Sequence, residues 1–158
     1  MENPILRIGH SSFNSPPYYM SGMVFRNIDI PQGAEIISTH LKVQSYSSDI
    51  TGHVYCTIQV EANDDAIEFD SSNKIDSRPT TDSSVDWNLI EPWSQYTWYE
   101  SPDIAAVIQE VIDRNGWDAG NSLVIIISTR LEESSYRSLC SFDYNSDSAP
   151  QLEITYVP

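Results

Sequence analysis

Apolar and polar residues alternate along much of this chain. In residues 53–61 the side chains of Val54, Cys56, Ile58 and Val60 fall on one face, and polar ones fall on the other. Such alternation is typical of a β-strand with one buried face. Residues 122–129 are apolar on both faces, as in a central covered strand. Together with the turn residues between them, these patterns predict strands over residues 23–30, 36–45, 53–61, 122–129, 136–142 and 151–157.

One segment has a helical period instead. Its apolar residues recur at spacings of three and four, at positions Ile104, Val107, Ile108, Val111 and Ile112. This stripe predicts an amphipathic helix over about residues 102–115. Ser101 is the expected cap, Pro102 and Asp103 suit the first turn, and Gly116 is expected to end the helix.

Many short strands and one helix predict an all-β fold. We expect an antiparallel β-sandwich, jelly-roll-like, with the helix crossing one end. A chain of 158 residues is expected to form a single module over residues 1–158. Residues 62–86 are polar and rich in Asp and Ser, and long irregular stretches of this kind are usually functional or mobile.

The charge balance excludes some partners. The chain has 8 basic and 23 acidic residues, which gives a net charge of −15. Nucleic acids and anionic membrane surfaces need a basic footprint, so neither is an expected partner. A strong negative balance is compatible with divalent cations. No apolar run approaches the roughly 18 residues of a membrane span, so membrane insertion is not expected.

The cysteines and the N-terminus leave alternatives open. Cys56 and Cys140 each lie in a strand-like run, so they are either two separate core residues or one disulfide. The first ten residues lack the basic and apolar regions of a signal peptide. The protein is therefore either made inside the cell or is a module of a longer secreted chain.

Residues 91–100, E-P-W-S-Q-Y-T-W-Y-E, concentrate aromatic side chains. Such rings stack on the apolar faces of sugars while their polar edges form hydrogen bonds. Candidate ligand-binding residues are therefore Trp93, Tyr96, Trp98 and Tyr99. Alternation places Tyr96 and Trp98 on one face and Tyr99 on the other. We expect Trp87 and at least one of Trp93 and Trp98 in the core, with Tyr99 or Tyr96 more exposed.

The acidic stretch that follows residue 62 is a candidate calcium site. Calcium binds several oxygen ligands from carboxylates, amides and backbone carbonyls in a loop. The candidate metal ligands are Asp64, Asp65, Glu68, Asp70 and Asp76. The segment lacks the order of an EF-hand, and the alternative is a solvated acidic loop. Residues 142–147, F-D-Y-N-S-D, form a second such place.

Four segments in order resemble the DNRLRE-type β-sandwich modules. F-R-N-I-D-I-P-Q-G-A-E-I-I-S-T-H-L is similar to the family's Ile-Pro-x-Gly-Ala strand segment, and V-D-W-N-L-I-E-P-W to its tryptophan segment. D-I-A-A-V-I-Q-E-V-I resembles its helix, and the end of the chain resembles its Pro-x-Leu-x-Val-x-Tyr close. The resemblance runs from about Ile5 to Tyr156, and in it Trp87 and Trp93 match recurring, structural positions.

This resemblance implies a non-catalytic accessory module of a secreted or surface bacterial protein. Some such modules bind alginate through Lys and Arg, whereas this chain has 2 Lys and 6 Arg, which disfavours direct polyuronate binding. The family's opening strand, which precedes the segment matched by I-L-R-I-G, is missing here. An edge is therefore expected to be unpaired and available to another chain.

Three functions are compatible with these features. The leading hypothesis is an extracellular or cell-surface module that binds a polysaccharide or another glycan without catalysis. The alternative is a structural or adhesive subunit that self-associates through an edge strand. The third is a glycoside-active enzyme. The sequence argues against it, because the three histidines, His10, His40 and His53, are scattered over separate segments and no nucleophile motif is present.

Overall fold

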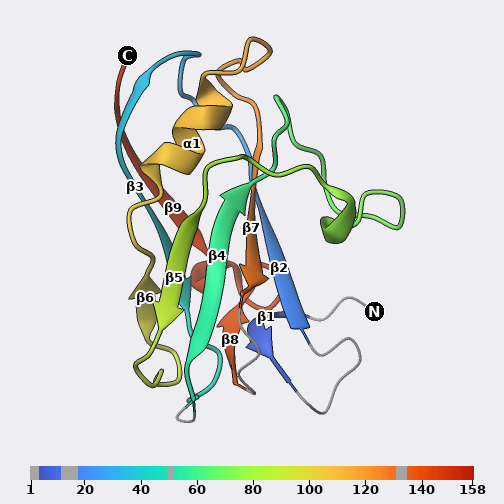
Figure 1. Ribbon diagram of the computed structural model, residues 1–158, viewed down its shortest axis with the longest axis vertical. Helices are drawn as coiled ribbons and strands as arrows, with labels where there is room; N and C mark the ends of the chain where they lie inside the picture. Colours follow the sequence, from blue (N-terminus) through green and yellow to red (C-terminus); the bar gives the residue numbers. More distant parts are fainter. Residues whose placement is uncertain (1–3, 12–17, 50–51, 131–134) are drawn as a thin grey trace.

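The computed structural model describes residues 4–11, 18–49, 52–130 and 135–158. They form two antiparallel sheets and one short α-helix, with two short 3₁₀ helices in connections (Figure 1). The predicted all-β sandwich with one helix is confirmed. The elements are β1 (Ile5–His10), β2 (Tyr18–Phe25), β3 (Glu35–Gln44), β4 (Val54–Val60), η1 (Ile75–Ser77), β5 (Val85–Leu89), β6 (Trp98–Glu100), α1 (Ala105–Ile112), β7 (Leu123–Thr129), β8 (Tyr136–Cys140), η2 (Ser146–Ser148) and β9 (Gln151–Val157).

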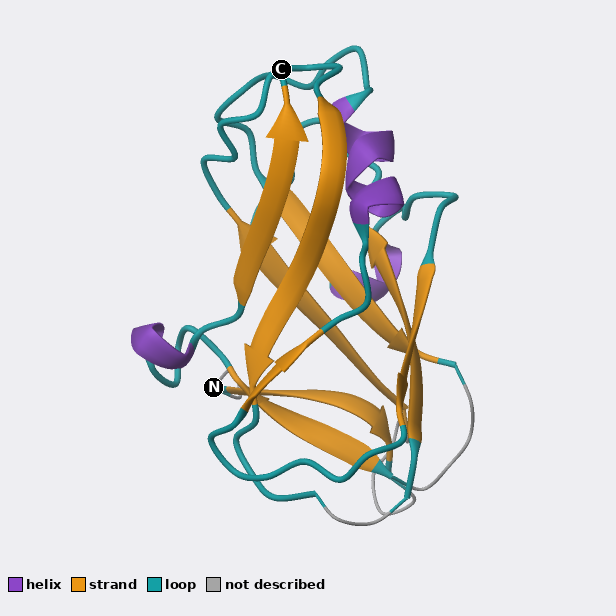
Figure 2. Cartoon of the chain, turned by 90° about the vertical axis from the view of Figure 1, so that its left-hand side faces the viewer, coloured by secondary structure: helices purple, strands orange, loops and turns teal. Residues whose placement is uncertain are grey.

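The larger sheet has the strand order β5-β4-β7-β2-β1-β8, and the smaller sheet has the order β6-β3-β9. Figure 2 shows β3 and β9 side by side as one layer, with the larger sheet behind them. The inward faces of both sheets supply one hydrophobic core. Its members from four strands include Leu41, Val43, Ile58, Val60, Ile125, Ile127 and Leu139.

The clearest predicted strands form as expected. In β4 the buried and half-buried residues alternate, and Val54, Cys56, Ile58 and Val60 point into the core. All of Leu123–Ile127 in β7 are buried, because the core covers one face and a small cluster with Ala66 covers the other. In β9 the side chains of Leu152, Ile154 and Tyr156 pack against the core.

The strand predicted over residues 23–30 is wrong in its second half. Strand β2 ends at Phe25, and Asn27 adopts a left-handed conformation with φ of 55°. Asparagine tolerates that region better than most residues, and it takes the chain out of the sheet. Residues 26–30 are therefore a connection, although their apolar alternation continues.

Helix α1 is confirmed, but it is shorter than the predicted range of residues 102–115. It begins after Ile104, not at Pro102, because the Asp103 carboxylate accepts hydrogen bonds from the N–H groups of Thr39 and Ala105. The Ser101 hydroxyl donates a hydrogen bond to the Pro102 carbonyl and does not cap the helix. The predicted buried stripe is correct, and α1 packs beside β3 at one end of the sandwich (Figure 1).

The segment I-L-R-I-G does not leave the expected free edge. It belongs to β1, which pairs with β2 on one side and β8 on the other. In the small sheet β9 pairs only with β3 among the described strands.

Cys56 and Cys140 are both free and buried, so the alternative of two separate core residues is the correct one. Burial raises the pKa of the Cys56 thiol to about 12. Its Sγ donates to the Trp87 carbonyl at 3.2 Å.

Candidate functional site

Half of the aromatic window is scaffold. Trp93 is only 3 % exposed, and its ring stacks on Tyr99 with centroids 4.3 Å apart and an interplanar angle of 3°. Trp87, also buried, contacts Trp93 from another side at 6.1 Å. The Tyr99 hydroxyl accepts a hydrogen bond from the Ser94 N–H at 2.8 Å. The expectation that Trp87 and at least one of Trp93 and Trp98 lie in the core is confirmed, and of the two tyrosines named as more exposed it is Tyr96 that reaches solvent. The buried ring of Trp93 is not available to stack on a ligand.

The other half of the window reaches solvent. Tyr96 is 52 % exposed and Trp98 39 % exposed. Tyr96 has a φ of 57° and lies in the turn that precedes β6, where its side chain is exposed. Its hydroxyl lies 3.5 Å from that of Tyr144, which in turn contacts Tyr46 edge to face at 5.1 Å. The window and the β8–β9 connection therefore meet at the surface.

Beside Trp98 lies a cavity of about 540 Å³, here called the small-sheet pocket. Its walls come from all three strands of the small sheet and from η2. The lining residues are Lys42, Trp98, Tyr99, Glu100, Asp147 and Gln151. Cross-strand pairing brings these side chains together, since Lys42 is paired with Glu100 in β6 and with Gln151 in β9.

Ion pairs fix two charged groups of this pocket, Lys42 and Glu100. Lys42 Nζ lies 2.5 Å from Glu153 Oε2 and 3.6 Å from Glu100 Oε2. His40 Nδ1 lies 3.7 Å from Glu100 Oε1 and 3.1 Å from the Ser101 carbonyl. The hydrogen bond with Glu153 raises the pKa of Lys42 and lowers that of Glu153. Lys42 and Glu153 therefore both stay ionised near neutral pH.

Of the lining residues, Trp98, Tyr99 and Glu100 belong to the aromatic window and Asp147 belongs to residues 142–147, whereas Lys42 and Gln151 lie in no segment that the sequence singles out as a candidate site. The alternation in T-H-L-K-V-Q does place Lys42 opposite Leu41 and Val43, on the outward face. That signal identifies the face, but only the pairing of β3 with β6 and β9 shows which side chains share it.

A second cavity lies on the outward face of the larger sheet. It measures about 650 Å³, and its walls are mostly apolar, with Tyr18, Met20, Phe69 and Ile75 among them. Lys74 and Asp76 are its charged lining residues. A sugar needs several hydrogen-bonding groups beside an aromatic face, so the small-sheet pocket is the better candidate for a glycan.

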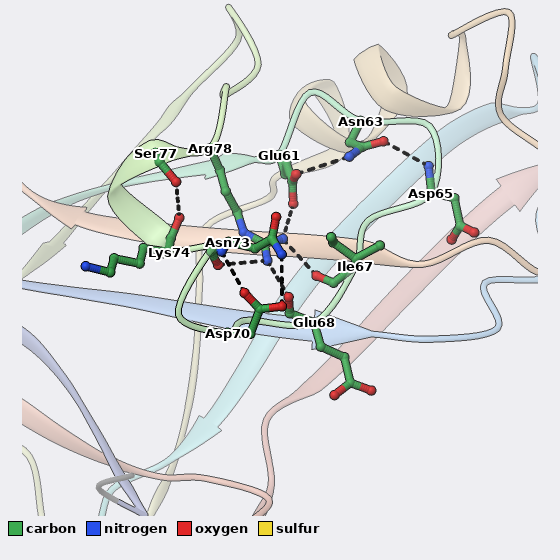
Figure 3. A network of polar contacts seen from close by, with 10 residues as sticks. All are labelled: Glu61, Asn63, Asp65, Ile67, Glu68, Asp70, Asn73, Lys74, Ser77 and Arg78. Atoms are coloured by element: carbon green, nitrogen blue, oxygen red, sulfur yellow. Dashed lines mark hydrogen bonds and ion pairs between the residues drawn. The ribbon is translucent and has the colours of Figure 1, made fainter. Parts of the chain in front are cut away.

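The acidic loop, residues 61–84 between β4 and β5, is organised by an arginine (Figure 3). The Arg78 side chain is 4 % exposed and forms an ion pair with Glu61, which is 5 % exposed. Its guanidinium also donates to the carbonyls of Ile67, Glu68 and Asn73 at 2.8, 2.7 and 3.2 Å. One carboxylate and three carbonyls thus surround a cation that is part of the protein itself, the guanidinium of Arg78.

Phe69 completes this arrangement. The guanidinium of Arg78 lies 4.2 Å from the centroid of the Phe69 ring, a cation–π contact. On its other side the ring lies against the backbone of Gly22, where an added Cβ would be 2.3 Å from Phe69 Cζ. Glycine at this point of β2 therefore lets the acidic loop cover the larger sheet.

The predicted calcium ligands point to different protein partners. Asp64 pairs with Arg114, Glu68 pairs with Arg26, and Asp65 accepts from the Ser122 N–H. Asp70 accepts from the Ser72 and Asn73 N–H groups and from the Asn73 amide, and Asp76 lines the apolar cavity. Within residues 4–11, 18–49, 52–130 and 135–158, no three His, Cys, Asp or Glu side chains gather as a metal site.

No protein-family model matches this chain, and no curated protein matches it. The resemblance to DNRLRE-type modules therefore stays a prediction. Among the described residues, no helix is both long enough and apolar enough to span a membrane.

Proposed function

We propose that this protein is a non-catalytic carbohydrate-binding module of a secreted or surface protein, with its glycan in the small-sheet pocket. The observation that carries the proposal is the exposed ring of Trp98 beside the amide, ammonium and carboxylate groups that line the same cavity. A ring face for stacking and nearby groups for hydrogen bonding are the two requirements for binding a sugar. The resemblance to DNRLRE-type modules implies the same class of function.

A binding role fits the carboxylates of this pocket better than hydrolysis does. A glycosidase needs one carboxyl group with a raised pKa to protonate the leaving oxygen. Lys42 instead lowers the pKa of Glu153 and also lies 3.6 Å from Glu100. A group held in its ionised form by a partner is a poor general acid.

Tryptophan fluorescence tests the proposal directly. Of the four tryptophans, all of which lie in described residues, Trp98 is the exposed one, while Trp87, Trp93 and Trp117 are buried. Titration with a panel of soluble oligosaccharides should therefore change the emission of Trp98. The variant Trp98→Ala should lose about fivefold or more in affinity, since stacking contacts are worth about 1–3 kcal/mol.

Met20→Ala is the matched control, because Met20 is also exposed but lines the other cavity. It should bind as tightly as the natural chain. If no oligosaccharide changes the emission or the heat of binding, the proposed function is wrong. If Met20→Ala is the variant that loses affinity, the ligand occupies the apolar cavity instead.

Self-association is a second candidate, supported by β9. This strand of seven residues pairs on one side only among the described strands, and Val157 at its end is exposed. Exposed edges of that length can pair with a second copy. Light scattering over a concentration series should then show more than one chain; a monomer at all concentrations would rule this out.

A further inference from the structure

The small-sheet pocket and its rim carry more negative than positive charge. The carboxylates of Glu100, Asp147 and Glu153 lie in or beside it, whereas Lys42 supplies its ammonium group. Lys42 is held between Glu100 and Glu153. In the described parts of the chain, Asp147 has no basic side chain within 4 Å. The pocket therefore offers a ligand at least one carboxylate that the protein does not neutralise.

The aromatic wall of the pocket, the ring of Trp98, also favours a positively charged ligand. The face of an indole ring carries a negative partial charge and attracts cations within about 6 Å. Trp98 lines the pocket and is partly exposed, so a ligand placed on its ring also lies near Glu100 and Asp147. A positive group attached to a sugar ring would thus meet an attractive ring face and attractive carboxylates at one place.

We infer that the pocket selects glycans that carry positive charge, namely oligosaccharides of amino sugars with free, protonated amines. This inference rests on the proposed function and names its substrate class. Neutral sugars would gain the stacking contact but no ionic one, and uronates would meet repulsion from the three carboxylates. The rank of affinity is therefore amino sugar, then neutral sugar, then uronate.

Four tetrasaccharides test that rank. Three share one β-1,4-linked backbone and are built from glucosamine, N-acetylglucosamine or glucose, and the fourth is a polyuronate fragment. Calorimetry at about pH 6 keeps the amines and the carboxylates charged. The glucosamine tetrasaccharide should bind about tenfold more tightly than its acetylated form, because each exposed ion pair contributes up to about fivefold.

Three variants assign the preference to the pocket. Asp147→Asn should reduce the ratio of amine to acetyl affinity about two- to fivefold. Glu35→Gln is the matched control, since it removes the same charge from an exposed position at the far end of β3. It should leave the ratio unchanged. Trp98→Ala should weaken all bound tetrasaccharides, and the glucosamine one most, because the attraction of the ring for cations is lost together with the stacking contact. Salt at about 1 M should remove the preference for the amine and leave the binding of the neutral tetrasaccharides.

The outcomes separate this inference from the proposed function. If the glucose and N-acetylglucosamine tetrasaccharides bind as tightly as the amine, the pocket binds glycans but the inference is overturned. Equal losses in Glu35→Gln and Asp147→Asn would also overturn it, because the net charge of the chain would then explain the attraction. If no tetrasaccharide binds at all, both proposals fail.

Discussion

The acidic loop and the aromatic window both look like binding segments in the sequence, but the folded chain uses them differently. The acidic loop directs its oxygens inward, to the buried guanidinium of Arg78. The window divides, so that Trp93 and Tyr99 stack inside while Tyr96 and Trp98 reach solvent. A segment rich in ligand atoms is available to a partner only where the fold leaves those atoms unsatisfied.

The contrast is also one of rigidity and residual charge. Around Arg78, the ion pair and three carbonyl contacts satisfy the cation almost completely. Around Lys42, a single ammonium group faces two carboxylates, those of Glu100 and Glu153, at an open surface. The first region is therefore expected to matter for stability and the second for binding.

Replacement of Arg78 should have the largest effect on stability. Arg78→Met leaves the Glu61 carboxylate buried without its partner and frees three carbonyls, which should cost about 3–5 kcal/mol. Urea denaturation measures this loss. Arg26→Met is the matched control, because its ion pair with Glu68 is exposed, and its cost should stay within about 0.5 kcal/mol. Similar losses in both variants would contradict the internal-cation role of Arg78.

Alanine at each of the two tryptophans of the window should show which ring supports the fold and which lies at the surface. Trp93→Ala removes a buried ring that contacts Trp87 and Tyr99, and should destabilise the protein by about 3–5 kcal/mol. Trp98→Ala should cost less than about 1 kcal/mol, since its ring is partly exposed. Equal stability losses, again from urea denaturation, would mean that Trp98 is also structural.

Acid should weaken both regions. The Asn73 amide lowers the pKa of Asp70 in the acidic loop, and Lys42 lowers that of Glu153 on the small sheet. A carboxyl whose pKa is lower in the folded state contributes stability above its unfolded pKa of about 4, and that contribution is lost as the pH falls through the folded value. Melting temperatures should therefore be level from about pH 7 to 5 and fall below about pH 4. Asp70→Asn and Glu153→Gln should each flatten this fall, and a flat profile in the natural chain would contradict the expectation.

Addition of a calcium chelator should have the smallest effect on the melting temperature. Since Arg78 already fills the centre of the acidic loop and Asp64, Asp65, Glu68 and Asp70 have protein partners, a chelator should leave the melting temperature unchanged. A clear drop on addition of chelator, reversed by calcium but not by magnesium, would show that the loop binds calcium.

The sequence predicts most of the fold because burial acts on local patterns. The strict alternation in β4 and the apolar stripe of α1 each identify their buried faces correctly. The missed elements are short or lack a pattern. Strand β6 has three residues, and it follows a turn in which Tyr96 has a positive φ.

The candidate site is harder to predict because it is assembled from distant strands. Lys42, Glu100 and Gln151 become neighbours only through the register of β3 with β6 and β9. Arg78 shows the same limit, since nothing in the run of Asp and Ser around it indicates that one arginine will bind the loop's carbonyls. Spacing in the chain reports which face a side chain lies on, and not which partner it meets.

The two buried thiols can also report which part of the larger sheet opens first. Cys56 lies in β4, inside the larger sheet, and Cys140 lies at the end of β8, at that sheet's edge. A thiol-specific reagent can modify either one only when the surrounding strands separate, since both are buried. The order in which the two sulfur atoms are labelled therefore reports which end of the sheet opens first, with no added probe.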